Sequence, residues 1–108
     1  MKIKSVDIYK EPADSKHKYR AEFVLENDKT KTTKFGARDY SDYTIHKDPE
    51  RKERYIARHK KDLQTNDPTR AGYLSMYILW NKKTFEDSFE DYKRRINIYN
   101  KTGNFPTN

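Results

Sequence analysis

Apolar positions recur with a period of two through the first third of the chain. One face of a short segment carries four apolar side chains, Tyr19, Ala21, Phe23 and Leu25, while its other face is mainly charged. This alternation predicts a half-buried β-strand over about residues 18–26. Residues 2–9 mix β-branched and charged side chains and predict an earlier strand, in which Ile3 is out of phase with Val6 and Ile8.

A turn signal follows this strand. Asn27 and Asp28 both tolerate a positive φ angle, so the pattern predicts a two-residue turn and a return strand over about residues 29–36. Direct pairing across such a turn would oppose Phe23 with Thr32 and would place Phe35 on the polar face beside Arg20. Either a bulge near Gly36 corrects this register, or that face of the sheet is covered.

The remaining two thirds of the chain has helical periodicity. Asp48 and Pro49 predict a helix start, and the helix is expected over about residues 49–61, with Tyr55, Ile56 and His59 facing inward. A second helix, over about 69–81, is apolar around much of its circumference and is expected to be central. Thr84 with Asp87 resembles a capping box and predicts a third helix over about 85–100, which Gly103 ends.

The order of these elements predicts one small α+β domain over residues 1–108. Three strands form an antiparallel meander, the three helices follow and pack on one sheet face, and residues 101–108 form a short C-terminal tail. Only 32% of the residues are apolar, but 14% are aromatic, and each aromatic ring buries a large area. We therefore expect a thin aromatic core.

Charge is concentrated in one segment. The net charge is +7, and residues 47–61 hold seven Lys or Arg side chains against three acidic ones. This composition favours an anionic partner, which could be nucleic acid, an acidic protein face or a phospholipid surface. The basic surface is expected to comprise Lys47, Arg51, Lys52, Arg54, Arg58, Lys60 and Lys61. The alternative is a solvated helix face on which Glu50 pairs with Arg54.

The loop SDYTIHKD, residues 41–48, is dense in polar aromatic and acidic side chains. One interpretation is a docking surface, with partner-binding side chains at Tyr40, Asp42, Tyr43 and His46, because Tyr is enriched at interfaces. The other is an ordered loop that caps the following helix. The two interpretations are compatible.

Patterns typical of catalysis or metal binding are missing. The chain has no Cys, and His46 and His59 lack the spacing of a metal site, so we expect no metal and no cofactor. Ser41 and Thr44 lie near His46 without a recognisable triad. Tyr55, flanked by Arg54, Arg58 and His59, could suggest phosphodiester chemistry, but its position predicts a core role. We expect a protein that is not an enzyme, with no small-molecule substrate.

No segment suggests export or a membrane span. Residues 1–10 lack the apolar region of a signal peptide, and the longest apolar run, 76–80, is far shorter than a membrane-spanning helix. The expectation is a soluble protein of intracellular origin.

Four sequence motifs fall within residues 34–83: KFGA, SDYTIHKD, RYI followed by RHKK, and LWNK. In these motifs the chain resembles a family of small uncharacterised basic proteins of large nucleocytoplasmic double-stranded DNA viruses. The resemblance implies a viral protein present in the virion, and in the host cytoplasm or virus assembly site during infection. It implies no catalytic residue.

Taken together, these features favour a structural protein of the virus particle. We expect a minor capsid or cement protein that binds viral capsid proteins through the SDYTIHKD loop and the neighbouring aromatic side chains. The alternative is a nucleic-acid-binding accessory protein that uses the basic helix at residues 47–61. A weaker third possibility is a small regulator of a host protein.

Overall fold

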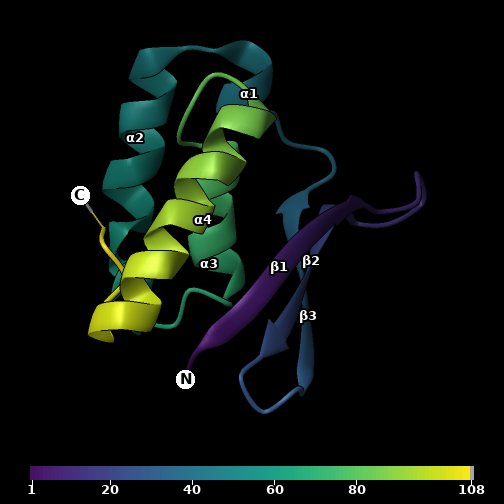
Figure 1. The fold of residues 1–108 in the computed structure, drawn as a ribbon. Coiled ribbons are helices and arrows are strands. Elements are labelled where there is room, and N and C mark those ends of the chain that lie inside the picture. The colour runs from purple at the N-terminus through teal and green to yellow at the C-terminus, as the bar shows by residue number, and fades with distance from the viewer. Residues whose placement is uncertain (108) are drawn as a thin grey trace.

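The strands form a three-stranded antiparallel sheet in the order β1-β2-β3, and the helices cover one of its faces (Figure 1). A computed structural model describes residues 1–107. The elements are β1 (Ile3–Lys10), β2 (His17–Leu25), β3 (Thr30–Ala37), α1 (Tyr43–His46), α2 (Pro49–His59), a 3-10 turn η1 (Lys60–Leu63), α3 (Ala71–Leu74), a π-helical segment η2 (Ser75–Leu79) and α4 (Phe85–Thr102). The predicted α+β fold, with a meander followed by helices, is confirmed. The short helix α1 was not predicted.

The β2–β3 hairpin differs from the predicted register by one residue. Phe23 pairs with Lys31, and Tyr19 pairs with Phe35. The connection is a three-residue loop in which Asp28 has φ of 64° and Leu25 N donates to Lys29 O. This extra loop residue brings Phe35 to the apolar face, where it is buried, so the register needs no shift near Gly36.

A bulge in β1 explains the misplaced Ile3. The pairing shifts between Ile3, opposite Leu25, and Ser5, opposite Val24. The additional residue on β1 turns Ile3 to the same face as Val6, and both side chains are buried. A second contact holds this end of the strand, because the Asn100 side chain on α4 bonds both the N–H and the carbonyl of Ile3.

The capping predictions for α2 and α4 are confirmed. The Asp48 carboxylate accepts from the N–H groups of Glu50 and Arg51, and Pro49 is the first residue of α2. The Thr84 hydroxyl accepts from Asp87 N at the start of α4. Gly103, with φ of 81°, ends α4, and its N–H donates to Tyr99 O.

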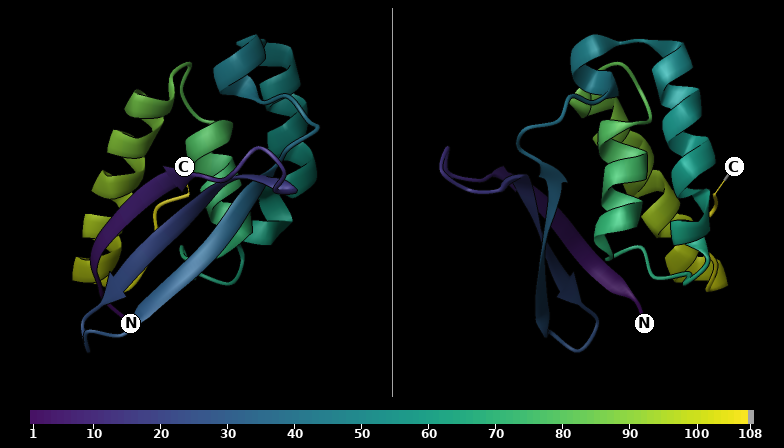
Figure 2. Two further views of the ribbon diagram at one scale, coloured as in Figure 1. Left: turned by 90° about the vertical axis from the view of Figure 1, so that its right-hand side faces the viewer. Right: turned by 180° about the vertical axis from the view of Figure 1, so that it is seen from behind.

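The predicted second helix begins two residues later and ends two residues earlier than expected. It consists of α3 and η2, and the N–H of Trp80 donates to the carbonyl of Ser75 in π-helical geometry. Its central position is confirmed, because nearly every residue from Tyr73 to Leu79 is buried. Figure 2 shows this segment between α2 and α4, with the sheet in front.

The core is aromatic, as expected, and includes the predicted tail. Phe105 is only 5% exposed, and its ring makes edge contacts with Tyr73 and Tyr77. Its N–H donates to the Asn66 side chain, and Arg95 Nη1 donates to Pro106 O. The segment after α4 is therefore packed against the helices as far as it is described.

Candidate functional site

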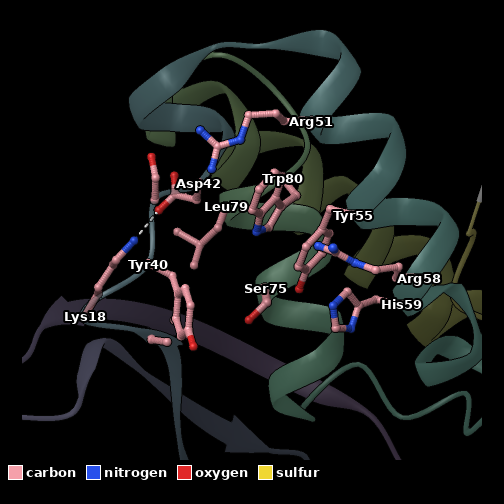
Figure 3. Close-up of a pocket in the computed structure, with 13 residues that line it drawn as sticks. Lys18, Tyr40, Asp42, Arg51, Tyr55, Arg58, His59, Ser75, Leu79 and Trp80 are labelled. Atoms are coloured by element: carbon pink, nitrogen blue, oxygen red, sulfur yellow. Dashed lines mark hydrogen bonds and ion pairs between the residues drawn. The ribbon is translucent and has the colours of Figure 1, made fainter.

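A pocket of about 440 Å³ lies between α2 and the end of β3. We call it the α2 pocket. Its lining residues come from β2, β3, the following loop, α2 and the α3–η2 segment: Lys18, Gly36, Ala37, Tyr40, Ser41, Asp42, Arg51, Tyr55, Arg58, His59, Ser75, Leu79 and Trp80. Its volume is within the range of ligand sites in proteins. Figure 3 shows the side chains of α2 on one wall and those of the sheet and loop on the other.

The spacing of residues on α2 forms the first wall. Arg51, Tyr55 and Arg58 are four and three residues apart, so they lie on one face of the helix. Both guanidinium groups reach toward the pocket (Figure 3). Among the described residues, no ion pair or hydrogen bond involves either guanidinium group, so their charges are uncompensated.

A stack of three rings supports this wall. The Tyr55 ring lies parallel to that of Trp80, with centroids 4.2 Å apart, and His59 stacks on Tyr55 at 4.2 Å. Ser75 lines the same pocket beneath these rings. The predicted inward orientation of Tyr55 is confirmed, whereas His59 lies at the pocket edge and contacts Asp62 at 3.2 Å.

The opposite wall combines a glycine with one free aromatic ring. Gly36 has φ of 78°, which favours glycine, and a Cβ there would lie 2.8 Å from Leu79 Cδ1, so the end of the Leu79 side chain would have to move. Tyr40 is 74% exposed and forms no ring contact within the described chain. Lys18 Nζ donates to Asp42 Oδ2 at 2.7 Å, which neutralises the one acidic side chain of the lining.

Two of the four predicted docking residues, Asp42 and Tyr43, lie inside the protein. Asp42 is 2% exposed and caps α1 by accepting from the N–H and hydroxyl of Thr44. Tyr43 is 7% exposed. The structure therefore favours the ordered-loop interpretation for these residues, because buried side chains are not available to a partner in this conformation. Tyr40 is exposed and His46 is partly exposed.

His46 has a structural contact on each side of its ring. Its Nδ1 accepts from Asp48 N at 2.9 Å, and its ring lies 5.2 Å from that of Trp80. Its Nε2 is buried without a hydrogen-bond partner among residues 1–107. Burial lowers the pKa of His46 below its usual value, and the positive charge of Arg51 lowers it further. The imidazole is therefore held in its neutral form, in which Nδ1 can accept.

The structure divides the predicted basic surface. Lys47 Nζ donates to the carbonyls of Thr44 and Lys83, and Lys52 Nζ donates to Asn81 O at 2.6 Å. Burial lowers the pKa of Lys52, with a smaller effect from Lys82. These two lysines thus tie α1 and α2 to the turn before α4.

The other predicted basic residues point in different directions. Arg51 and Arg58 line the α2 pocket, whereas Lys60 and Lys61 line two separate hollows. Arg54 is exposed on α2, and the described residues include no ion pair between it and Glu50. No single flat basic face results.

The Tyr55 hydroxyl is held in its protonated form. Burial raises its pKa above the usual value of tyrosine. An attacking tyrosine needs the opposite shift. Among residues 1–107, no three His, Asp or Glu side chains gather as a metal site would require, and none of the helices there could cross a membrane.

Sequence patterns alone did not identify several pocket residues, because they are distant from α2 in sequence: Lys18, Gly36, Ser75, Leu79 and Trp80. For the α2 wall a local signal was available. The spacing of Arg51, Tyr55 and Arg58 indicates which basic residues share a helix face with an aromatic ring.

Fold and pocket together define a small α+β domain with a basic, aromatic pocket on its helical side. The chain belongs to the family of unknown function DUF5754, whose model matches residues 6–59. This match spans the sheet and α2, and among the pocket residues only Ser75, Leu79 and Trp80 lie beyond it. No curated protein and no solved structure matches the chain.

Proposed function

We propose that this protein is a non-enzymatic structural protein of a large DNA virus particle. In this role it is a minor capsid or cement protein that binds a capsid protein. The viral setting rests on the resemblance of residues 34–83 to proteins of such viruses. The binding role rests on the α2 pocket.

One observation carries the binding role. Arg51 and Arg58 present uncompensated charges beside an exposed tyrosine, Tyr40, at the mouth of a preformed hollow. Arg and Tyr are the residue types that contribute most binding energy at protein interfaces, particularly around a pocket that admits a partner side chain. The thin aromatic core, by contrast, is a feature of folding and says nothing of the partner.

Quantitative mass spectrometry of purified, salt-washed particles tests this proposal, with shell and core fractions separated. We expect enrichment in the shell fraction at a constant ratio to a capsid protein. If infected cells contain the protein and purified particles lack it, the proposal fails and a host-directed role replaces it.

The second candidate is a nucleic-acid-binding accessory protein, favoured by the absence of ion pairs at Arg51, Arg54 and Arg58 among the described residues. It predicts enrichment in the genome-containing core and duplex binding that weakens steeply with salt. Replacing the three arginines by Gln should abolish that binding without unfolding the domain. The division of the basic residues among separate hollows supports it less well, since only three cations share this side of α2.

A further inference from the structure

We propose that the α2 pocket binds a short, extended, acidic segment of a partner protein, with one aromatic side chain of that segment seated in the hollow. This inference rests on the proposed binding role and names the chemistry of the partner. It also assigns separate tasks to the two walls of the pocket.

Charge selects an acidic occupant. The lining contains three fully cationic side chains, Lys18, Arg51 and Arg58, against one carboxylate. Lys18 and Asp42 form an ion pair at 2.7 Å, with side-chain exposures of 13% and 3%. Their charges compensate each other and do not select the ligand. The excess positive charge therefore belongs to the two arginines, and a carboxylate can form a bidentate pair with each guanidinium group.

The spacing of the arginines sets the spacing of the carboxylates. Seven residues of α-helix separate Arg51 from Arg58, which is about 10.5 Å along the axis. Three residues of a polyproline II chain cover about 9 Å and return to the same face of the chain. An extended segment of this kind with two acidic residues three positions apart thus matches the two guanidinium groups, and its intervening side chains point away from them, one toward the pocket floor.

The apolar floor of the pocket and the exposed ring of Tyr40 favour an aromatic side chain between the two acidic residues of the partner segment. Leu79 and the Tyr55–Trp80 stack supply an apolar base, while Tyr40 stands free on the opposite wall. A partner ring that enters between Tyr40 and Tyr55 contacts the Tyr40 ring on one side. On the other side it displaces water from the apolar base of the pocket, and both contacts stabilise the complex. Tyr40 is the side chain best placed to fold over it (Figure 3).

A protein segment fits these features better than a nucleic acid strand. The wall formed by Gly36, Ala37, Tyr40 and Ser41 carries no cation, and the rings of Tyr55 and Trp80 are already stacked on each other. A strand of nucleic acid requires cations along its backbone and exposed ring faces for its bases. The pocket has one free ring, that of Tyr40, and two available cations, Arg51 and Arg58.

Trp80, the single tryptophan of the chain, reports on the pocket directly. The probe is a nine-residue peptide with a central phenylalanine, two aspartates on each side of it, and serine and glycine at both ends. It contains carboxylates three positions apart and no tryptophan. On titration into the full-length protein, we expect a saturable change in Trp80 emission, lost when the aspartates are replaced by asparagine or the phenylalanine by alanine.

Two double variants of equal charge separate the pocket from general attraction. Arg51→Gln with Arg58→Gln should weaken binding about tenfold or more, since two charge-assisted contacts are removed. Arg54→Gln with Lys61→Gln removes the same charge from the same region outside the pocket and should change affinity by less than about threefold. Tyr40→Ala, at an exposed position, should weaken binding severalfold. Circular dichroism on each variant establishes that the domain is folded.

Three results would overturn the inference. The first is the absence of a saturable change with the probe. The second is equal weakening by both double variants, which would indicate unspecific attraction. The third is a Trp80 response to a 12-nucleotide single-stranded DNA that requires Arg51 and Arg58 and exceeds the peptide response, which would make nucleic acid the occupant.

Failure here is distinguishable from failure of the proposed function. If the protein is enriched in particle shells but does not bind the peptide, the structural role stands and the proposed occupant of the α2 pocket is wrong. If the protein binds the peptide through Arg51 and Arg58 but is absent from particles, the proposed occupant stands and the virion role is wrong.

Discussion

Tyr55 on α2 and Trp80 at the end of η2 stack with their ring planes 3° apart and their centroids 4.2 Å apart. This contact joins the helix that carries the arginines to the central segment of the core. His46 contacts the same Trp80 ring at 5.2 Å. The position of α2, and therefore the width of the α2 pocket, depends on this aromatic cluster.

Removal of the Tyr55 ring should loosen α2. We expect Tyr55→Ala to lower the free energy of unfolding by about 2–4 kcal/mol, because a large, partly buried aromatic side chain is lost. Tyr55→Phe keeps the stack and removes only the hydroxyl, so it should cost less than about 1 kcal/mol. Urea denaturation followed by circular dichroism measures both. Equal losses for the two variants would mean that the hydroxyl, and not the stack, holds α2.

Gly36 and Gly103 provide a matched test of the close approach between β3 and η2. Both have positive φ, 78° and 81°, but a Cβ at Gly36 would lie 2.8 Å from Leu79 Cδ1, whereas a Cβ at Gly103 would meet nothing within 4 Å. Gly103→Ala should therefore cost about 1 kcal/mol for the backbone alone. Gly36→Ala should cost about 1–3 kcal/mol more, because Leu79 must move. Similar thermal denaturation midpoints for the two variants would contradict this account.

His46 should make stability depend on pH between about 7 and 5. Its pKa is lowered in the folded protein, mainly by burial, so the unfolded chain binds the proton more readily. The stabilising contribution is therefore complete above the unfolded pKa, near 6.5, and is lost as the pH falls below it. Protonation at Nδ1 would also remove the acceptor for Asp48 N.

The measurement is the slope of unfolding free energy against pH, from denaturant titrations. His46→Asn should flatten the slope between pH 7 and 5, and His17→Asn should leave it in place. A slope unchanged by His46→Asn would assign the pH dependence to another group. Three carboxylates with lowered pKa, Asp67, Glu90 and Asp91, act only in more acidic solution.

Asp91 should be more important for stability than its neighbour Glu90. Burial would raise the pKa of Asp91, but hydrogen bonds from Arg95 and Asn81 outweigh it and lower that pKa. Its side chain is 10% exposed, and it bonds Arg94, Arg95 and Asn81 at 2.6–2.8 Å. Asp91→Ala should cost about 2–4 kcal/mol, because the partly buried donors of Arg95 and Asn81 lose a charged acceptor.

Glu90→Ala is the control for this change. Glu90 pairs with Lys93 at 2.7 Å, but its side chain is 66% exposed, so the effect should be less than about 1 kcal/mol. Equal destabilisation by the two variants in urea denaturation would show that Asp91 acts only as a surface charge.

Local signals predicted the elements well. The period of two in residues 19–25, the Asp48–Pro49 helix start and the Gly103 helix end each depend on a few neighbouring residues, and each appears in the structure. The hairpin register was wrong by one residue. Asn27 and Asp28 are compatible with loops of either two or three residues, and only the need to bury Phe35 opposite Tyr19 selects the longer loop.

The candidate site was predicted less completely. For the loop residues Asp42, Tyr43 and His46, one of the two interpretations predicted a docking surface, because such side chains are common at interfaces. Yet Lys18 from β2 pairs with Asp42, and Trp80, the residue after η2, contacts His46. Such burial of polar groups depends on partners that are distant in sequence, and no local pattern identifies them.

The sequence by itself determined the α+β class, the order of the elements, the caps of α2 and α4, and the concentration of positive charge between Lys47 and Lys61. These properties depend on local periodicity, backbone preference and composition. Only the tertiary structure decided which basic side chains face the pocket, that Phe105 belongs to the core, and that Gly36 lies against Leu79. The physical reason is that burial and pairing depend on contacts across many residues of chain, which exist only after the helices have packed on the sheet.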